Sequence, residues 1–487
     1  MSSPSTSSAD LKRKAISAAT LSLLQVAGAH AIRLGGNLIL TRLLFPEAFG
    51  MLSLVTTLLY GVSMLSDIGI SDSIIRSPRG DEREFVDTAW TLQVIRGLII
   101  FAGCCVLAYP FAWFYEAPDL VFLVQLSGIA IVIRGFTPVK LLSLGRHLKL
   151  ARVAGLDLSS QVVGLACTTL LAAQFGATWT LPVGTMLATF VRVVGAMLFV
   201  PGPNGRFCLA PGPRKEISTY GRWIVVSSTL TFIAASSDTL IIGRLAGVEF
   251  LGVYGIAANL ARAPGMALIS VSDRVVFPLY SRLTSEGEAL AEHFERVRQP
   301  LLVGAAATTA ILMAVGDSLI QVLYDDRYQA GGSLIRVLAL AGWIRIYCVT
   351  NESALKALGV PRAVATGTLA RVLCLLICLP IAIRFGGVDT GIWVLVLADL
   401  LAAMLTTYAV VGTYHLARWR APLPMTAGIV SSAYAASYLA EQIVQTNSSR
   451  LIVAGSIASL CWALPLAGLL RTLLRARAQR AETRKPA

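Results

Sequence analysis

The sequence predicts an all-α membrane protein of about fourteen transmembrane helices, with two pseudo-symmetric six-helix lobes and two extra C-terminal helices. Three observations predict it: 55% of the residues are apolar and 14% charged, the mean hydropathy is +0.70, and apolar runs recur along the whole chain. Apolar runs of about 20 residues can satisfy their backbone hydrogen bonds in a bilayer only as helices or closed barrels. A water-soluble enzyme is excluded, because soluble domains carry about 25% charged residues.

The first part of the chain is expected to form a disordered cytoplasmic tail, residues 1–14, followed by an N-lobe, residues 15–200. The expected spans are Ile16 to Leu44, Gly50 to Ile75, Thr88 to Tyr109, Asp119 to Leu142, Val153 to Phe175 and Trp179 to Val200. The first of these is too long for the apolar core of a signal peptide and is followed by many further spans. We therefore expect it to be an uncleaved first helix.

A Pro- and Gly-rich segment, PGPNGRFCLAPGPRK, lies in the middle of the chain. Because its prolines and glycines disfavour a continuous helix, we expect residues 201–216 to be a cytoplasmic linker and a hinge. A C-lobe is expected over 217–416, two more helices over 417–474 and a basic cytoplasmic tail over 475–487. The expected spans are Ile217 to Leu245, Leu251 to Tyr280, Gln299 to Tyr324, Ser333 to Leu358, Ala363 to Phe385, Thr390 to His415, Leu423 to Val444 and Leu451 to Leu474.

The formal net charge of +14 is explained by topology rather than by nucleic-acid binding, since the basic residues gather at the ends of apolar runs. One alternate set of connections holds most of the Lys and Arg, including Lys12 to Lys14, Arg146, Arg214, Arg296, Arg298 and the C-terminal arginines. The opposite set holds little beyond Arg327, Arg384 and Arg450. Because cytoplasmic loops retain basic residues, both termini are predicted to be cytoplasmic.

An internal repeat links the two halves. TRLLFPEAFGML aligns with GRLAGVEFLGVY, in which Arg244 and Gly252 lie 202 positions after Arg42 and Gly50. The number of helices between the copies is even, so both copies have the same orientation in the membrane. This pattern is typical of two-lobed transporters with a route between the lobes.

Charged residues inside the apolar runs are the candidate functional residues. An Arg or Asp at the centre of a span costs roughly 2.5 to 3.5 kcal/mol if it faces lipid, so an aqueous cavity or a counter-ion is the expected environment. Arginine stays charged and its forked donors suit phosphate, so a surplus of arginines predicts a cationic cavity for an anionic substrate. The arginines are Arg33, Arg96, Arg134, Arg192, Arg262, Arg345 and Arg371. Snorkelling to a membrane face or internal pairing is the alternative for each of them.

Four aspartates share these runs: Asp67, Asp157, Asp238 and Asp399. A buried carboxylate can bind a proton or a sodium ion, and a salt bridge to an arginine is an equally good interpretation. Glu352 and Lys356, four residues apart, are interpreted as a brace on the surface of a helix.

The eight cysteines lie nearly all in apolar runs without zinc-like spacing, and we interpret them as small hydrophobic residues. Neither a metal nor a cofactor is expected.

Other membrane functions fit less well. No GxxxxGK[ST] motif is present, which argues against an ATP-driven pump, and no repeated filter suggests a channel. A membrane polymerase or ligase acting on lipid-linked sugars remains an alternative. The short outward connections FPEAFG, FYEAPD and YDDRYQAGG argue against it, because such enzymes usually need a sizeable external loop.

Several segments resemble the polysaccharide transporter family, the Wzx-type flippases of the multidrug/oligosaccharidyl-lipid/polysaccharide exporter superfamily. They are LTRLLFPEAFGML, LSDIGISDSIIR, FVDTAWTLQVIRGLII, DTLIIGRLAGVEFLGVYGIAANLARAPG, VFPLYSRL and VLYDDRYQAGGSLIRVLAL. The resemblance extends from about Ala15 to Leu416, and its most specific part surrounds Asp238, Gly243, Gly252 and Tyr254.

The resemblance implies a non-enzymatic, multi-pass protein of the bacterial inner membrane. It implies that undecaprenyl-diphosphate-linked repeat units are translocated by alternating access for exopolysaccharide, capsule or O-antigen synthesis. The implied partners are membrane lipid, the lipid-linked substrate, and a polysaccharide polymerase with a chain-length regulator, with the protein itself a monomer. A cation-coupled multidrug-type antiporter of the same superfamily is the main alternative. The resemblance does not show which arginines bind the substrate. Their assignment depends only on the free-energy cost of placing a charged side chain in the bilayer.

Overall fold

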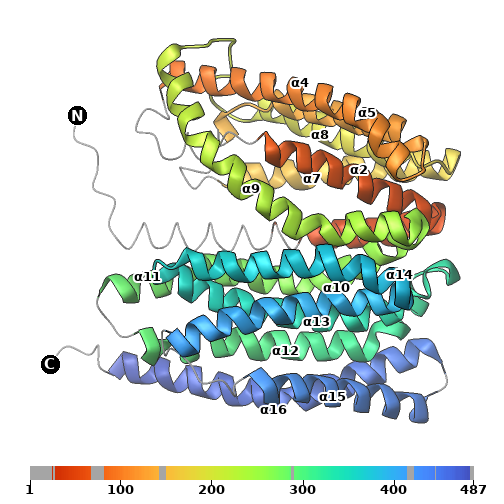
Figure 1. Ribbon diagram of the computed structural model, residues 1–487, viewed down its shortest axis with the longest axis vertical. Coiled ribbons are helices and arrows are strands. Elements are labelled where there is room, and N and C mark those ends of the chain that lie inside the picture. The colour runs from red at the N-terminus through yellow and green to blue at the C-terminus, as the bar shows by residue number, and fades with distance from the viewer. Residues whose placement is uncertain are drawn as a thin grey trace. The chain divides into compact units, whose positions relative to one another are not determined.

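The computed structural model describes residues 25, 28–66, 82–141, 150–286, 290–413, 422–444 and 446–482. Within these ranges the regular structure is entirely helical (Figure 1). Eight of the described helices are long and apolar enough to cross a membrane. The predicted all-α membrane class is confirmed, whereas the predicted total number of spans stays a prediction.

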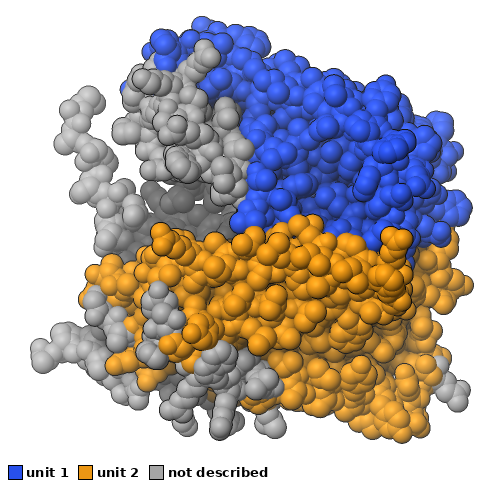
Figure 2. Space-filling model, viewed as in Figure 1, with its two compact units in different colours: residues 1–252 blue, residues 253–487 orange. Residues whose placement is uncertain are grey.

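The chain divides into two compact units, residues 1–252 and 253–487, which Figure 2 shows in different colours. Unit 1 holds a helix over residues 28–43 and then α2 (Pro46–Leu65), α4 (Arg83–Phe114), α5 (Asp119–Gly135), α7 (Leu150–Phe175), α8 (Thr180–Phe199) and α9 (Pro211–Leu245). The first residues of α10 (Gly247–Val271) also belong to it. The predicted lobe boundaries follow the internal repeat rather than these contacts, and they stay a prediction.

Helix pairs build unit 1 through close contacts between small residues. α4 packs on α5, and α7 packs on α8. On α8, a Cβ atom added at Gly184 would lie 2.9 Å from the carbonyl oxygen of Gly164 on α7, so only glycine fits at this position. Helices in a membrane associate by this kind of packing, because burial against apolar lipid provides little driving force.

The two copies of the predicted repeat contact each other at their glycines. A Cβ atom added to Gly50 would lie 1.7 Å from the carbonyl oxygen of Val248, and one added to Gly252 would lie 1.9 Å from that of Pro46. Val248 lies 202 positions after Pro46, the same shift that relates the two glycines, so the contact is reciprocal. A self-complementary contact of this kind is typical of a two-fold relationship, and it supports the repeat identified in the sequence.

The Pro- and Gly-rich segment after α8 is docked on α4. Its backbone N–H groups at Arg206, Cys208 and Ala210 donate to Asp87 Oδ1 at 3.0 Å, Thr91 Oγ1 at 2.9 Å and Thr88 Oγ1 at 3.2 Å, respectively. Three side chains of one helix therefore hold the segment, and its role as a cytoplasmic linker and hinge over residues 201–216 stays a prediction.

The helix after this segment begins earlier than expected. α9 starts at Pro211 rather than at Ile217. Proline is favoured in a first helical turn, where its missing N–H leaves no intrahelical bond unmade.

Unit 2 continues α10 and contains α11 (Phe277–Ser285), α12 (Leu290–Leu323), α13 (Gly331–Ala357), α14 (Pro361–Thr407), α15 (Pro422–Ile443) and α16 (Asn447–Glu482). Short π-helical or 3₁₀ stretches adjoin them: η1 (Ser272–Val276), η2 (Asp326–Tyr328) and η3 (Tyr408–Thr413). α14 breaks at Gly387, whose φ of 80° and ψ of 175° are not helical. The break lies between the two spans predicted over this stretch.

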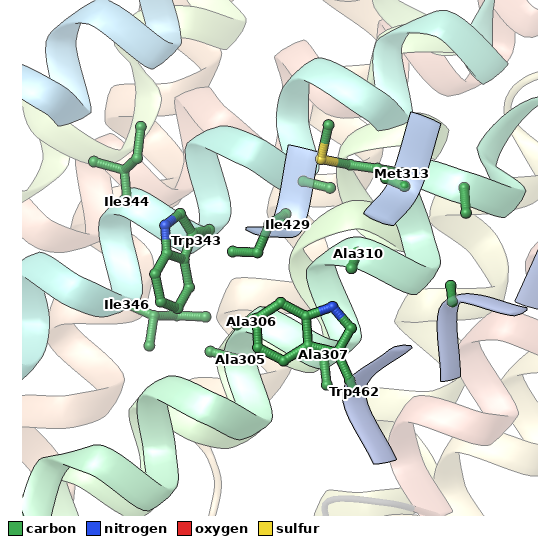
Figure 3. Packing of buried hydrophobic residues seen from close by; sticks show 14 of the residues in the cluster. Ala305, Ala306, Ala307, Ala310, Met313, Trp343, Ile344, Ile346, Ile429 and Trp462 are labelled. Carbon is green, nitrogen blue, oxygen red and sulfur yellow. The ribbon is translucent and has the colours of Figure 1, made fainter. Parts of the chain in front are cut away.

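The core of unit 2 lies around α12, which packs on α13, α15 and α16. Ala305, Ala306 and Ala310 let neighbouring helices approach closely, and Trp343 and Trp462 fill the space beside them (Figure 3). Both indole N–H groups are satisfied: Trp343 donates to Thr426 Oγ1 at 3.0 Å, and Trp462 to a serine hydroxyl at 3.1 Å. An unsatisfied donor at membrane depth would cost several kcal/mol, so these bonds allow large aromatic side chains in the core.

Candidate functional site

In unit 1, one predicted arginine forms an ion pair between α7 and α8. Arg192 Nε lies 2.5 Å from Asp157 Oδ1, and Asp157 Oδ2 accepts a hydrogen bond from Gln25 Nε2 at 2.9 Å. The pair is partly exposed, with 32% of the Arg192 side chain and 19% of the Asp157 side chain accessible. The aspartate therefore has two donors and neutralises the arginine.

Unit 2 holds two similar pairs. Arg371 Nε lies 2.7 Å from Asp399 Oδ1, so the pair links the two parts of α14 on either side of its break. Arg345 Nη1 lies 2.9 Å from Glu352 Oε1 two turns further along α13. Both carboxylates are more buried than their arginines. A buried carboxylate needs such a partner, because an unpaired charge in a low-dielectric interior is strongly destabilising.

Arg96 on α4 is bound to the end of α2. Its Nη2 donates to the carbonyl oxygen of Ser63 at 2.7 Å, and its Nε donates to the hydroxyl of Ser66 at 3.4 Å. α2 has no basic residue of its own in its last turn. Arg96 thus supplies a cation to the negative end of the α2 dipole, a stabilising position for a positive charge.

The three remaining predicted arginines have exposed side chains: Arg33, Arg134 and Arg262. Arg262 Nη2 donates to the hydroxyl of Tyr254 at 3.0 Å, two turns earlier on α10. Arg134 lies in the last turn of α5. Within the described part of the chain, neither Arg33 nor Arg134 forms a salt bridge. The exposed guanidinium groups of Arg33 and Arg134 can therefore accept an anionic ligand without first breaking a salt bridge.

The remaining predicted aspartates lie in different settings. Asp238 is buried in α9, and its Oδ1 accepts the backbone N–H of Thr239 at 2.8 Å. Asp67 lies outside the described residues. Of the predicted aspartates that are described, Asp157 and Asp399 pair with arginines, which fits the salt-bridge interpretation of those two.

Glu352 and Lys356 form the expected pair along one helix, but the prediction that the pair lies at the surface is wrong for Glu352. Glu352 is only 5% exposed, and it accepts from Arg345 and from the Cys348 thiol. Lys356 Nζ lies 3.9 Å away. Spacing along one helix identified the pair, but the neighbouring α14 decides whether that face is buried.

Sequence reasoning missed the most buried charge in unit 2. Arg298, which was assigned to a cytoplasmic connection, lies in α12 with no exposed surface. Its guanidinium donates twice to Glu295, at 3.0 and 2.7 Å, and once to Asn351 Oδ1 at 2.9 Å. The rings of Phe294 and Tyr347 lie 4.4 and 5.3 Å from its Cζ atom. The spacing of Glu295 and Arg298 was the only sequence signal, and it does not separate a buried pair from a surface pair.

No group of three or more His, Cys, Asp or Glu side chains suited to a metal occurs in the described ranges. The eight cysteines are free thiols. The geometry therefore offers arginines, some neutralised by carboxylates and some exposed, as the chemistry available for a ligand.

The model of the family described as "Polysaccharide biosynthesis protein" matches residues 39–331. The chain belongs to this family. The match includes the repeat contact at Gly50 and Gly252 and all of α4 to α12. The resemblance stated from the sequence motifs is confirmed.

Two curated relatives agree with the family assignment. The lipopolysaccharide biosynthesis protein WzxC of Escherichia coli is 24% identical over 69% of this chain and 68% of its own length. The succinoglycan biosynthesis transport protein ExoT of Rhizobium meliloti is also 24% identical, over 69% of this chain and 68% of its own length.

The lipid II flippase MurJ in an inward closed conformation has a TM-score of 0.71 at 10% identity, covering 94% of this chain and 100% of MurJ. At that identity the likeness shows the fold alone. The chain thus has the fold of MurJ, and its apolar helices make it a multi-pass membrane protein. The prediction that the protein is not an enzyme agrees with the transport role named for ExoT.

Proposed function

We propose that the protein is a flippase that moves undecaprenyl-diphosphate-linked oligosaccharide repeat units across the bacterial inner membrane by alternating access. The observation that carries the proposal is the family match over residues 39–331. Membership of a polysaccharide biosynthesis family, together with a fold shared with a lipid flippase, supports a substrate that joins a lipid to sugars. The polysaccharide assembled from these repeat units is an exopolysaccharide, a capsule or an O-antigen.

The chemistry of the arginines suits a diphosphate headgroup. Arg33 and Arg262 carry exposed guanidinium groups on apolar helices, where facing lipid would cost roughly 2.5 to 3.5 kcal/mol each. We assign these two to diphosphate binding, because guanidinium binds phosphate oxygens in a bidentate manner. The arginines paired to Asp157 and Asp399 are assigned to holding helical segments together, and Arg345 is assigned to neutralising Glu352 within α13.

The energy source in this proposal is the membrane potential. A potential negative inside favours outward movement of an anion by about 2.3 kcal/mol per charge per 100 mV. Ion coupling through Asp67 or Asp238 is a further part of the proposal. Both termini are cytoplasmic, and the protein works as a monomer beside a polymerase and a chain-length regulator.

Reconstitution tests the proposal. Proteoliposomes containing a fluorescent polyprenyl-diphosphate oligosaccharide should show transfer between leaflets that depends on the protein. Combining Arg33→Ala with Arg262→Ala should slow the initial rate at least about tenfold, since a hydrogen bond to a charged group contributes about 1.5–3 kcal/mol. Arg384→Ala, which removes another exposed arginine of an apolar helix, is the matched control and should transfer at the wild-type rate.

Two outcomes would contradict the proposal. Equal transfer by the wild type and the double variant would refute the assignment of the two arginines while leaving the flippase function intact. Transport of a cationic dye, with no transfer of lipid-linked oligosaccharide by the wild type, would favour the multidrug-type antiporter instead.

A further inference from the structure

An open pocket of about 780 Å³ lies in unit 1 where α4 ends, α5 begins and α9 ends. Its wall is largely aromatic and apolar, and the charged residues among its described lining are Glu116 and Arg244. The lining residues are Tyr109, Ala112, Trp113, Phe114, Glu116, Ala117, Pro118, Val121 and Arg244. The hydroxyl of Tyr115 donates to the carbonyl oxygen of Leu240 on α9 at 3.0 Å and fixes the pocket's geometry.

The charged side of the pocket is an exposed ion pair. Arg244 Nη2 lies 2.8 Å from Glu116 Oε1, with 40% of the arginine and 73% of the glutamate side chain accessible. The guanidinium also lies 5.5 Å from the centre of the Phe114 ring. Both charges are therefore held in place and remain open to a ligand from outside.

The end of α4 fixes the position of the Glu116 backbone. Its φ is 54°, and it is the only residue other than glycine with a positive φ in the described ranges. The N–H of Glu116 donates to the Trp113 carbonyl at 3.2 Å and the N–H of Ala117 donates to the Ala112 carbonyl at 3.1 Å, which is a common left-handed end of a helix. The helix end therefore holds Glu116 in the wall of the pocket, where its carboxylate meets Arg244.

The pocket continues into an apolar stripe on α4. Ile99, Val106, Tyr109 and Trp113 are spaced three to seven residues apart, and each is more than half exposed. α4 is a candidate membrane span that ends at Phe114. Tyrosine and tryptophan at the end of a span mark the membrane interface, so the ion pair lies at headgroup depth and the stripe at acyl-chain depth.

We propose that this pocket binds a zwitterionic phospholipid with a primary ammonium group, of the phosphatidylethanolamine type. The lipid phosphate lies on Arg244, the ammonium lies on Glu116, and one acyl chain follows the exposed stripe of α4. A ligand with one negative and one positive group matches a pocket with one of each. An anionic phospholipid would place like charge against Glu116. The site is separate from the arginines assigned to the transported substrate and does not depend on that assignment.

The test is the lipid composition retained by the purified full-length protein. The protein is reconstituted in nanodiscs with equal phosphatidylethanolamine and phosphatidylglycerol, extracted in mild detergent, and the bound lipid is measured by native mass spectrometry. The wild type should retain phosphatidylethanolamine over phosphatidylglycerol by about fivefold, the ratio expected for one favourable ionic contact of roughly 1 kcal/mol.

Two variants separate the contacts. Glu116→Asn removes the charge while keeping a residue that tolerates positive φ, and it should abolish the preference. Arg244→Gln should reduce retention of both lipids. Arg327→Gln disrupts the comparably exposed pair to Asp325 and should leave retention unchanged. Melting curves of all variants show whether they are folded.

Other results would overturn the proposal. Equal or preferred retention of phosphatidylglycerol by the wild type, or an unchanged preference in a folded Glu116→Asn variant, would do so. Displacement of bound lipid by a soluble oligosaccharide would show that the aromatic wall is instead a platform for sugars.

Discussion

Replacing Gly50 by alanine tests whether the repeat contact is as close as the structure shows. The new Cβ atom would lie 1.7 Å from the carbonyl oxygen of Val248 and 3.1 Å from the backbone nitrogen of Gly252. Carbon contacts are favourable at about 3.5–4.0 Å, so α2 and the start of α10 must separate by roughly 2 Å. Neither clashing atom is the end of a flexible side chain, and rotation of a side chain therefore gives no relief.

The expected loss is large for a single methyl group. Overpacking a core typically costs about 1–3 kcal/mol and occasionally more, and a clash between two backbones belongs at the upper end. For a unit of this size, each kcal/mol lowers the melting temperature by roughly 2–4 °C. We expect Gly50→Ala to lower it by about 6–12 °C, measured by differential scanning fluorimetry in detergent.

Two glycines serve as controls. A Cβ atom at Gly155 in α7 or at Gly304 in α12 would meet nothing within 4 Å. Alanine there should be neutral or stabilising by up to about 1 kcal/mol, because glycine is a poor helix former.

The reciprocal variant adds a second test. Gly252→Ala should act like Gly50→Ala, and the double variant should lose less than the sum of the two, because helices already separated by one methyl group accommodate the second. A melting temperature of Gly50→Ala within a degree of the Gly155→Ala control would refute the reasoning.

Three further variants follow from individual contacts. Asp399→Asn should lower the free energy of unfolding by about 3–5 kcal/mol, since it leaves Arg371 in the interior without its carboxylate, and chemical denaturation should show a smaller loss for the more accessible Asp157→Asn. Tyr115→Phe should cost about 0.5–1.5 kcal/mol by removing the hydrogen bond to the Leu240 carbonyl, which keeps its helical partner in α9, and an unchanged melting curve would remove this bond from the account of the pocket. Gly387→Ala should cost about 1–2 kcal/mol because its φ of 80° strains any side chain, whereas the nearby exposed Asp389 should tolerate alanine in the same melting assay.

The amino-acid sequence determined the class of the protein and its repeat. Hydropathy alone predicts membrane helices, because a bilayer leaves the backbone few other ways to satisfy its hydrogen bonds. The repeat spacing predicted that Gly50 and Gly252 are equivalent, and the structure places them in a reciprocal contact. Both signals are local in the chain, so a single sequence contains them.

Only the tertiary structure decided which charges meet. The sequence presents Arg192, Arg371 and Arg298 alike as cations, yet the first two find aspartates 35 and 28 residues away and the third lies fully buried beside Asn351. The sequence also did not predict that the Pro- and Gly-rich segment docks on α4. The physical reason is that partners for a charge or a backbone N–H are chosen by which helix faces pack together, and periodicity along one helix carries no information about its neighbour.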